Sequence, residues 1–366
     1  MTRWDEMKEE LLDLICCPAC QQRLTAVTHE RHEPEIWTGE LVCIGCTAVY
    51  PIENGMPRLY VNDERWQPKA AEAEGWVTYH KDLGIYEVQE NAVDLQIPYY
   101  PEEPWRSVAR SFDIALQELK LTGQETILDL GAGRGWAAKQ FALRGCRVVA
   151  LDVVADENVG LGRARALMDD AGAYFDRLIG DGENLPLFPE QFDLVFCAAA
   201  LHHCANLPLL LQNIGRVLKP GGRLCAINEP CRPVIESEQS LLTRHAAHEL
   251  AVGIVETRPD WPAYERAIEG TELRVTAVCP AHAYHMDEEN LRLWSAVLGV
   301  VRPHWRQRPV RRQLVSWYRY GGRRLAALVR GARVPVADGP DEWQRMATAV
   351  LLWVGGEMFL MAEKRP

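Results

Sequence analysis

The sequence predicts an α/β protein: an open, mostly parallel sheet with helices on both faces, a small metal-binding module before it, and a helical insertion and extension after it. Three observations support this. An apolar stretch at 127–130 enters a glycine-rich turn, a helical pattern follows at 136–143, and a second apolar stretch at 147–151 ends at Asp152. This order is typical of the strand–turn–helix–strand unit of a parallel sheet. The same alternation continues to residue 230, with a helix expected over 158–171 and a fourth strand expected over 192–198. Two Cys-x-x-Cys pairs precede it.

Length and composition indicate a globular chain. Its 366 residues suffice for one large domain or two unequal ones, with 48% hydrophobic and 25% charged residues. The net charge of −11 argues against a general nucleic-acid binder. No apolar run approaches the roughly 20 residues that span a bilayer. The first ten residues are charged and lack the apolar core of a secretory signal, so we expect a cytoplasmic protein without a transmembrane segment.

Four cysteines near the start have the spacing of a zinc site. Cys17 and Cys20 form one Cys-x-x-Cys pair, and Cys43 and Cys46 form a second pair after 22 intervening residues. Two such knuckles offer four thiolates in tetrahedral geometry to Zn²⁺. A module this short buries little apolar area, so structural zinc would supply much of its folding free energy. Cys16 is expected to be a spare thiol.

The residues around these cysteines carry a family resemblance. The segments 11–24 and 39–60, and most specifically the pattern Tyr-Pro-Ile-x-x-Gly-x-Pro-x-Leu at 50–59, resemble the small zinc-ribbon activator subunit of eukaryotic tRNA, rRNA and protein methyltransferases and its bacterial relatives. The resemblance implies that residues 1–61 form a zinc ribbon. It also implies that the ribbon carries no chemistry and stabilises a methyltransferase instead.

The glycine-rich turn indicates which nucleoside binds. Its glycines, Gly131, Gly133 and Gly135, are preceded by Asp129, and Trp136 occupies the position of the third glycine of a dinucleotide fingerprint. A large indole there disfavours a pyrophosphate. The spacing Gly-x-Gly-x-Gly resembles motif I of class I S-adenosylmethionine (SAM) methyltransferases.

Two further motifs extend this resemblance over roughly residues 105–230. The stretch 180–186 resembles the Gly-Asp-Ala-Glu-x-Leu-Pro element of the same superfamily, and 217–224 (VLKPGGRL) resembles a signature of this group. A Rossmann-like SAM-binding core is therefore implied for 105–230, with Asp152 on the ribose and Asp181 on adenine. The complete set of implied cofactor-binding residues is Asp129, Gly131, Gly133, Gly135, Asp152, Asp181, Gly182 and Cys197.

Candidate catalytic residues follow the fourth and fifth expected strands. Methyl transfer from a sulfonium is an in-line displacement, so alignment and desolvation do most of the work, and a hydroxyl acceptor also needs a base. His203 is the favoured base, Glu229 the orienting residue or alternate base, and His202 a further candidate. The alternative for each is a packing or hydrogen-bonding role.

The remaining segments are expected to flank the cofactor domain. Residues 62–104 would form a linker and an aromatic cap, with Asn62–Glu74 as a connector. Residues 231–340 would form a substrate-side helical insertion, including a helix over 235–255 that carries His245 and His248 on one face. Residues 341–366 would add the final helix and strand to the sheet.

The span Arg302–Arg333 contains ten arginines and no acidic residue. It is either a basic face that complements the acidic remainder or a site for an anionic partner. That partner would be a phosphorylated, nucleotide-linked or lipid-linked substrate, a membrane surface or RNA. Tyr284 and His285 are expected substrate contacts in the same region.

Together these patterns favour a SAM-dependent methyltransferase with a fused zinc ribbon. The favoured acceptor is a hydroxyl of a small molecule, a sugar or a lipid-linked intermediate. Two alternatives stay open: an RNA base methyltransferase, and a catalytically silent SAM-fold scaffold that acts through its ribbon.

Overall fold

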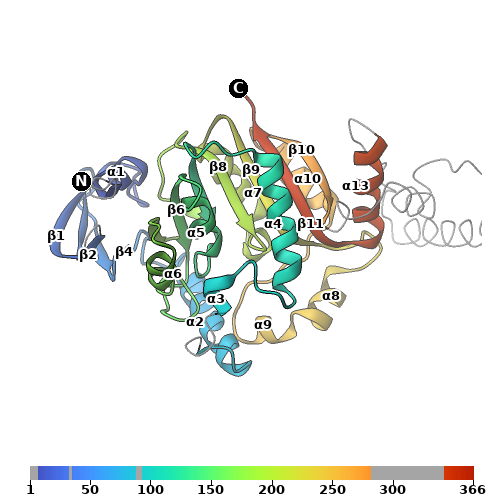
Figure 1. Cartoon of the computed structure of the whole chain (residues 1–366), viewed down its shortest axis with the longest axis horizontal. Helices are drawn as coiled ribbons and strands as arrows, with labels where there is room; N and C mark the ends of the chain where they lie inside the picture. Colours follow the sequence, from blue (N-terminus) through green and yellow to red (C-terminus); the bar gives the residue numbers. More distant parts are fainter. Residues whose placement is uncertain (1–6, 33–34, 88–92, 282–341) are drawn as a thin grey trace, which may run out of the picture.

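The computed structural model describes residues 7–32, 35–87, 93–281 and 342–366 (Figure 1). The chain begins with α1 (Met7–Leu14) and a four-stranded sheet in the order β1-β2-β3-β4. All three strand pairings in this sheet are antiparallel. The strands are β1 (Leu24–His32), β2 (Glu35–Cys43), β3 (Val49–Glu53) and β4 (Met56–Pro57). We call residues 7–61 the ribbon.

The main sheet has seven strands in the order β10-β11-β9-β8-β5-β6-β7. The strands from β9 to β7 pair in parallel, whereas β11 pairs antiparallel with both β9 and β10. The strands are β5 (Thr126–Leu130), β6 (Arg147–Asp152), β7 (Asp176–Ile179), β8 (Phe192–Ala198), β9 (Leu218–Cys231), β10 (Leu273–Pro280) and β11 (Gly356–Lys364). The predicted α/β class, with its ribbon and mostly parallel sheet, is confirmed.

Helices cover both faces because successive side chains of a buried strand point to opposite sides. Ile127 packs into one apolar cluster with Phe112, and the next residue, Leu128, packs into a second cluster with Ile214. The first face carries α4 (Trp105–Leu119), α5 (Trp136–Ala142) and α6 (Ala164–Ala171). The second carries α7 (Leu207–Val217) and α10 (Trp261–Glu269).

The ribbon packs against the β7 end of the main sheet, opposite β10 and β11 (Figure 1). Arg58 forms a parallel bridge with Ile179, and the Leu59 amide donates to the Ile179 carbonyl oxygen at 2.8 Å. An antiparallel bridge joins Ile15 to Leu187. Because an uncovered strand edge is a template for unwanted pairing, the ribbon protects β7 as well as packing on it.

Two expected segments differ from the structure. The connector expected over Asn62–Glu74 is already helical from Gln67, where α2 (Gln67–Asp82) begins. The single helix expected over 235–255 is broken at Ala246 into α8 (Glu238–His245) and α9 (Ala247–Ala251). His245 and His248 therefore do not share one helical face, and His248 Nε2 lies 3.0 Å from Asp82 Oδ2 on α2.

The short helix α3 (Val93–Gln96) precedes α4, and α13 (Glu342–Val354) precedes β11, as expected for the chain's last helix and strand. Tyr284, His285 and the Arg302–Arg333 segment lie outside the described residues. Within the described residues, no helix has both the length and the apolar character needed to cross a membrane.

Candidate functional site

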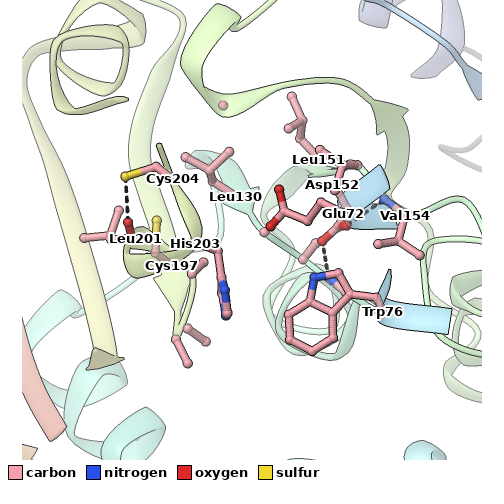
Figure 2. Close-up of a pocket in the computed structure, with 18 of the residues that line it drawn as sticks. Glu72, Trp76, Leu130, Leu151, Asp152, Val154, Cys197, Leu201, His203 and Cys204 are labelled. Carbon is pink, nitrogen blue, oxygen red and sulfur yellow. Dashed lines mark hydrogen bonds between the residues drawn. The ribbon is translucent and has the colours of Figure 1, made fainter. Parts of the chain in front are cut away.

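A pocket with a cavity of about 310 Å³ lies beyond the carboxyl ends of β5, β6, β7 and β8. This is the edge where open α/β sheets bind ligands, and the volume is at the lower end for a small-molecule site. Figure 2 shows Glu72, Trp76 and Asp152 on one side of the pocket and Cys197 and His203 on the other. The glycine turn, α2 and the loop after β8 therefore enclose one space.

The glycine turn forms the floor of this pocket. Gly131 has a φ of 71°, and a Cβ there would lie 2.5 Å from the Ala200 Cβ. Gly133 has a φ of 54° and lines the pocket, and a Cβ there would meet nothing within 4 Å. The first glycine thus permits close packing of two loops, and the second leaves open space above a bare backbone. A cofactor can approach the turn at Gly133.

Asp152 joins this turn to the end of β6. Its Oδ2 accepts the Gly133 amide at 2.8 Å and its Oδ1 accepts the Val154 amide at 2.8 Å. The carboxylate also lines the pocket, and burial raises its pKa, although the amide bonds oppose that rise. A carboxylate at this strand end retains acceptor capacity for the hydroxyls of a ribose.

Asp181 and Gly182 follow β7 and also line the pocket. The Asp181 side chain accepts the Glu183 amide at 2.9 Å and so caps the short helix η1 (Gly182–Asn184). Burial raises the pKa of Asp181. A Cβ at Gly182 would lie 2.9 Å from Leu210 Cδ1, so a larger residue would require the Leu210 side chain on α7 to shift.

Two of the implied cofactor residues do not line the pocket. Asp129 is buried and accepts the Ala138 amide at 2.9 Å, which fixes the first turn of α5 against β5. Burial, together with the neighbouring Asp152 charge, raises the pKa of Asp129 to about 7. Gly135 has a φ of 82° and is the N-cap residue of α5. Both residues shape the glycine turn, whereas Cys197 at the end of β8 does line the pocket.

Of the three catalytic candidates, His203 lines the pocket. It belongs to the short helix η2 (Leu201–His203), and its Nδ1 lies 2.7 Å from the Val255 carbonyl oxygen. Its ring meets Trp76 edge-on, with 5.1 Å between centroids. Burial, helped by the charge of His202, lowers the pKa of His203 to about 3, so its imidazole is neutral at physiological pH.

Glu229 and His202 lie behind His203, outside the pocket lining. Glu229 is fully buried; its Oε1 accepts the amides of Ala200 and Leu201 at 2.7 and 2.9 Å. Its Oε2 lies 3.0 Å from His202 Nδ1. Because both carboxylate oxygens are occupied by the loop after β8, Glu229 positions the loop that carries His203.

Helix α2 contributes pocket residues that the sequence patterns missed. Glu72 lines the cavity beside Lys69, whose Nζ lies 3.2 Å from Glu72 Oε2 and 3.3 Å from Glu183 Oε2. Burial raises the pKa of Glu72 to about 7, although Lys69 opposes the rise. The helix is polar along most of its length, so no apolar period marks it. Pro68 near its start, followed by several alanines and glutamates, was the available signal.

The expected aromatic cap is partly represented in the pocket: Trp76 and Trp105 line it. The tyrosines of the same stretch do not belong to the lining. Tyr79 instead donates to Glu249 on α9 at 3.0 Å, and Tyr99 donates to Asp113 on α4 at 3.0 Å. These tyrosines therefore hold the segment in place.

The four ribbon cysteines converge as the spacing predicts. Cys17 Sγ lies 3.6 Å from Cys46 Sγ, and Cys20 Sγ lies 3.4 Å from Cys43 Sγ. Sulfur atoms around a tetrahedral Zn²⁺ stand about 3.8 Å apart, so this donor set fits the ion. The amides of Gly45 and Cys46 point at Cys43 Sγ, as in a knuckle that supports a thiolate. Cys16 is outside the cluster.

Comparison with known proteins agrees with this geometry. Residues 128–226 match the family model of the methyltransferase domain, and residues 8–55 match that of Trm112p-like proteins. The chain carries a methyltransferase domain and a Trm112p-like domain. The two family resemblances inferred from the glycine turn and the cysteine ribbon are therefore confirmed, and with them a SAM-binding fold and a four-cysteine zinc-binding cluster.

Individual relatives match mainly in the methyltransferase domain. The biotin biosynthesis bifunctional protein BioHC of Cellvibrio japonicus is 40% identical over 101 residues, which are 26% of this chain and 18% of the relative. The ubiquinone biosynthesis O-methyltransferase of Aeromonas salmonicida is 31% identical over 98 residues, which are 27% of this chain and 40% of the relative. These curated relatives, and others like them, are matched over 18% to 51% of their length.

Among solved structures, a complex containing the Haloferax volcanii Trm112 methyltransferase activator is similar at a TM-score of 0.44 with 20% identity. The match covers 84% of this chain and all of that one.

Loss of zinc should unfold the Trm112p-like domain. We expect Cys43→Ser to lower the bound zinc from about one ion per chain to none and to lower Tm, because metal binding supplies much of the folding free energy of such a module. Metal analysis and thermal unfolding measure both effects. Cys16→Ser, the matched control, should keep its zinc; if both variants keep the ion equally, the four-thiolate site is wrong.

Burial of Glu72 should make the cofactor-free protein less stable as pH rises. Its pKa is about 7 in the folded protein against 4.5 when unperturbed, so the folded state binds more protons between these values. Stability therefore falls as pH rises through this window. We expect Glu72→Gln to stabilise the protein at pH 8 by on the order of 1–3 kcal/mol and to lose this advantage near pH 4.5.

Urea unfolding of Glu72→Gln at several pH values measures this difference. Lys69 keeps Glu183 as a partner in the variant. Glu74→Gln, exposed on the same helix, is the control and should change little. A pH-independent effect of Glu72→Gln would contradict the prediction.

Proposed function

We propose that this protein transfers a methyl group from SAM to an acceptor bound in the same pocket. The main observation that supports this proposal is that an open glycine turn and two carboxylates, Asp152 and Asp181, converge at one sheet edge. Single glycines or acids have simple structural explanations, but a set that follows three successive strands has the pattern of a nucleoside site. The matched methyltransferase family model supports the same assignment.

In this proposal each strand end binds one part of the cofactor. Asp152 binds the ribose hydroxyls, and Asp181 binds the amino group of adenine. The backbone at Gly131 and Gly133 accommodates the methionine portion, which leaves the sulfonium near Cys197 and His203. Lys69 and Glu72 on α2 close the pocket over the nucleoside. SAM would supply an electrophilic methyl group, and the chain's own residues would orient it and exclude water.

The acceptor would lie against His203 and Trp76. Because His203 Nδ1 faces the Val255 carbonyl, its Nε2 is the nitrogen that can accept a hydrogen bond or a proton from the acceptor. A neutral imidazole with a strongly lowered pKa is a weak base in the free protein. Its first contribution is therefore orientation of the acceptor. Trp76 adds an apolar wall that desolvates the methyl donor.

We infer that the acceptor atom is a hydroxyl or carboxyl oxygen of a small molecule. Ubiquinone biosynthesis and malonyl-acyl carrier protein O-methyltransferases are among the matched relatives, which favours oxygen without naming the substrate. Incubation with methyl-labelled SAM and a panel of phenols, sugars and carboxylic acids would test this. Label transfer to an RNA transcript alone would favour the RNA base methyltransferase instead.

Asp152 should contribute directly to cofactor affinity. We expect Asp152→Asn to weaken binding of S-adenosylhomocysteine by about 1.5–3 kcal/mol, roughly 10- to 100-fold, because a charged acceptor for the ribose hydroxyls is lost. Isothermal titration calorimetry measures this, with the exposed Asp169→Asn on α6 as control. If the unmodified protein does not bind S-adenosylhomocysteine at all, the silent-scaffold alternative is favoured.

His203 should act on the acceptor rather than on the cofactor. Once an acceptor is known, we expect His203→Ala to lower turnover by about 10²- to 10⁴-fold while the affinity for S-adenosylhomocysteine changes little. Steady-state kinetics and calorimetry on the same preparation separate the two effects. His245→Ala, exposed on α8, is the control. Unchanged turnover in His203→Ala would remove this residue from the mechanism.

A further inference from the structure

The short turn that carries His203 is held at both of its ends by other parts of the chain. This turn, η2, has three residues, and the His203 amide donates to the Ala200 carbonyl oxygen at 3.1 Å. A single 3₁₀ turn is too short to stabilise itself, and the peptide groups at its ends need outside partners. Glu229 Oε1 accepts the amides of Ala200 and Leu201 and so fixes the start of the turn. The partners at its end come from a different segment.

Residues 255–258, which we call the clamp segment, hold the end of the turn. The Thr257 amide and hydroxyl both donate to the His202 carbonyl oxygen, at 3.1 and 2.7 Å. The Val255 carbonyl oxygen lies 2.7 Å from His203 Nδ1. The backbone of one histidine and the ring of the next are therefore bonded to the same short segment.

The clamp segment has supports of its own outside the turn. The Arg258 amide donates to Glu238 Oε1 on α8 at 2.7 Å. Just before the segment, the Ile254 amide donates to the Glu249 carbonyl oxygen of α9 at 2.9 Å. Because neither bond involves η2, the clamp segment is anchored independently and can serve as a fixed reference for the turn.

These contacts decide which nitrogen of His203 faces the acceptor. A carbonyl oxygen can only accept, so Nδ1 carries the proton on the side of Val255 and Nε2 keeps its lone pair. His203 lines the pocket, whereas Thr257 is half-buried and does not belong to the lining. If the end of the turn moved, the Nδ1 bond would lengthen and either tautomer could form. The bonds at the His202 carbonyl oxygen thus control the direction of the His203 ring.

We propose that Thr257 is a positioning residue for the acceptor side of the pocket: by holding the His202 carbonyl oxygen, its hydroxyl keeps His203 Nδ1 on Val255 and leaves Nε2 for the acceptor. Any residue except proline would supply the amide bond, so the hydroxyl is the part that requires threonine or serine at this position. The role in turnover rests on the proposed methyl transfer. The effect on the His203 tautomer does not.

The first test measures the His203 ring in the full chain, without an acceptor. Long-range ¹H–¹⁵N NMR of protein with ¹⁵N-labelled histidine shows which ring nitrogen carries the proton, and His203→Gln assigns the signal. The unmodified chain should show the Nδ1-protonated form. Thr257→Val keeps the amide and nearly the shape of threonine but lacks the hydroxyl, so it should show a mixture of both tautomers. Thr257→Ser should restore the single form.

The second test follows turnover once an acceptor is known. Thr257→Val should lower kcat by about 3- to 10-fold, the loss expected for one neutral hydrogen bond, and Thr257→Ser should recover most of it. The affinity for S-adenosylhomocysteine, measured by calorimetry, should change by less than about twofold, because the cofactor residues keep their contacts. Thr243→Val is the matched control. The Thr243 hydroxyl also donates to a backbone carbonyl, that of Gln239 at 2.8 Å, but on the exposed face of α8.

An unchanged His203 tautomer in Thr257→Val overturns the proposal, whatever the turnover. A parallel loss of turnover and of S-adenosylhomocysteine affinity also overturns it, because Thr257 would then support the whole domain. If Thr257→Val does not fold, Thr257→Ala carries the same comparison with Thr257→Ser. If the unmodified chain binds no S-adenosylhomocysteine, the proposed function fails, and the tautomer measurement still decides whether Thr257 orients His203.

Discussion

The hydrogen bond between the Gly133 amide and the Asp152 carboxylate is the interaction on which the pocket depends. It ties the turn after β5 to the end of β6, and the second carboxylate oxygen holds Val154 beyond that strand. Gly133 can take its positive φ because it lacks a Cβ, and the same absence keeps the space above the turn open. One carboxylate thus fixes the backbone conformation that a ligand meets and is itself exposed to that ligand.

The ribbon packs on β7, the strand next to β6 in the same sheet. Arg58 and Leu59 pair with Ile179, two residues before Asp181, and Asn184 Nδ2 lies 3.5 Å from the Pro18 carbonyl oxygen in the ribbon's first knuckle. The zinc module therefore supports the segment that we assign to adenine, without contributing a residue to the pocket lining. Covalent fusion keeps this support at a high effective concentration, since the ribbon cannot diffuse away from β7.

Much of the fold could be predicted because its signals are local. The run Phe192–Ala198 forms β8 with the expected bounds, and the four cysteines meet as their spacing requires. Where prediction was wrong, the cause lies in tertiary contacts. The helix expected over 158–171 begins only at Ala164. Before it, Arg134 Nε donates to the Asn158 carbonyl oxygen at 2.7 Å and the Leu161 amide donates to the Val154 carbonyl oxygen at 3.0 Å, so these groups are bonded outside a helix. Helix α2 has no apolar period, because its buried positions are Lys69, Glu72 and Gly75.

The site residues also divide into those that local sequence signals could place and those that only tertiary contacts place. Asp152 and Asp181 could be placed from strand ends alone, because parallel strands bring their carboxyl ends to one edge. Val255 could not, since it follows β9 by more than 20 residues and reaches His203 only through the path of α8 and α9. The distinction between His203 in the pocket wall and His202 behind it also depends on the direction of a single 3₁₀ turn, which sequence spacing does not encode.

The charges that line the pocket would favour binding of SAM over binding of S-adenosylhomocysteine. Asp152, Asp181 and Glu183 are acidic, and Glu72 is about half ionised near pH 7. Lys69 and Arg134 carry the positive charges of the lining. SAM carries a sulfonium charge that S-adenosylhomocysteine lacks. Since opposite charges attract more strongly in a partly buried site than in water, this surplus of carboxylates stabilises the methyl donor more than the spent cofactor. Transfer of the methyl group thus removes part of the attraction that retained the cofactor, which favours its release.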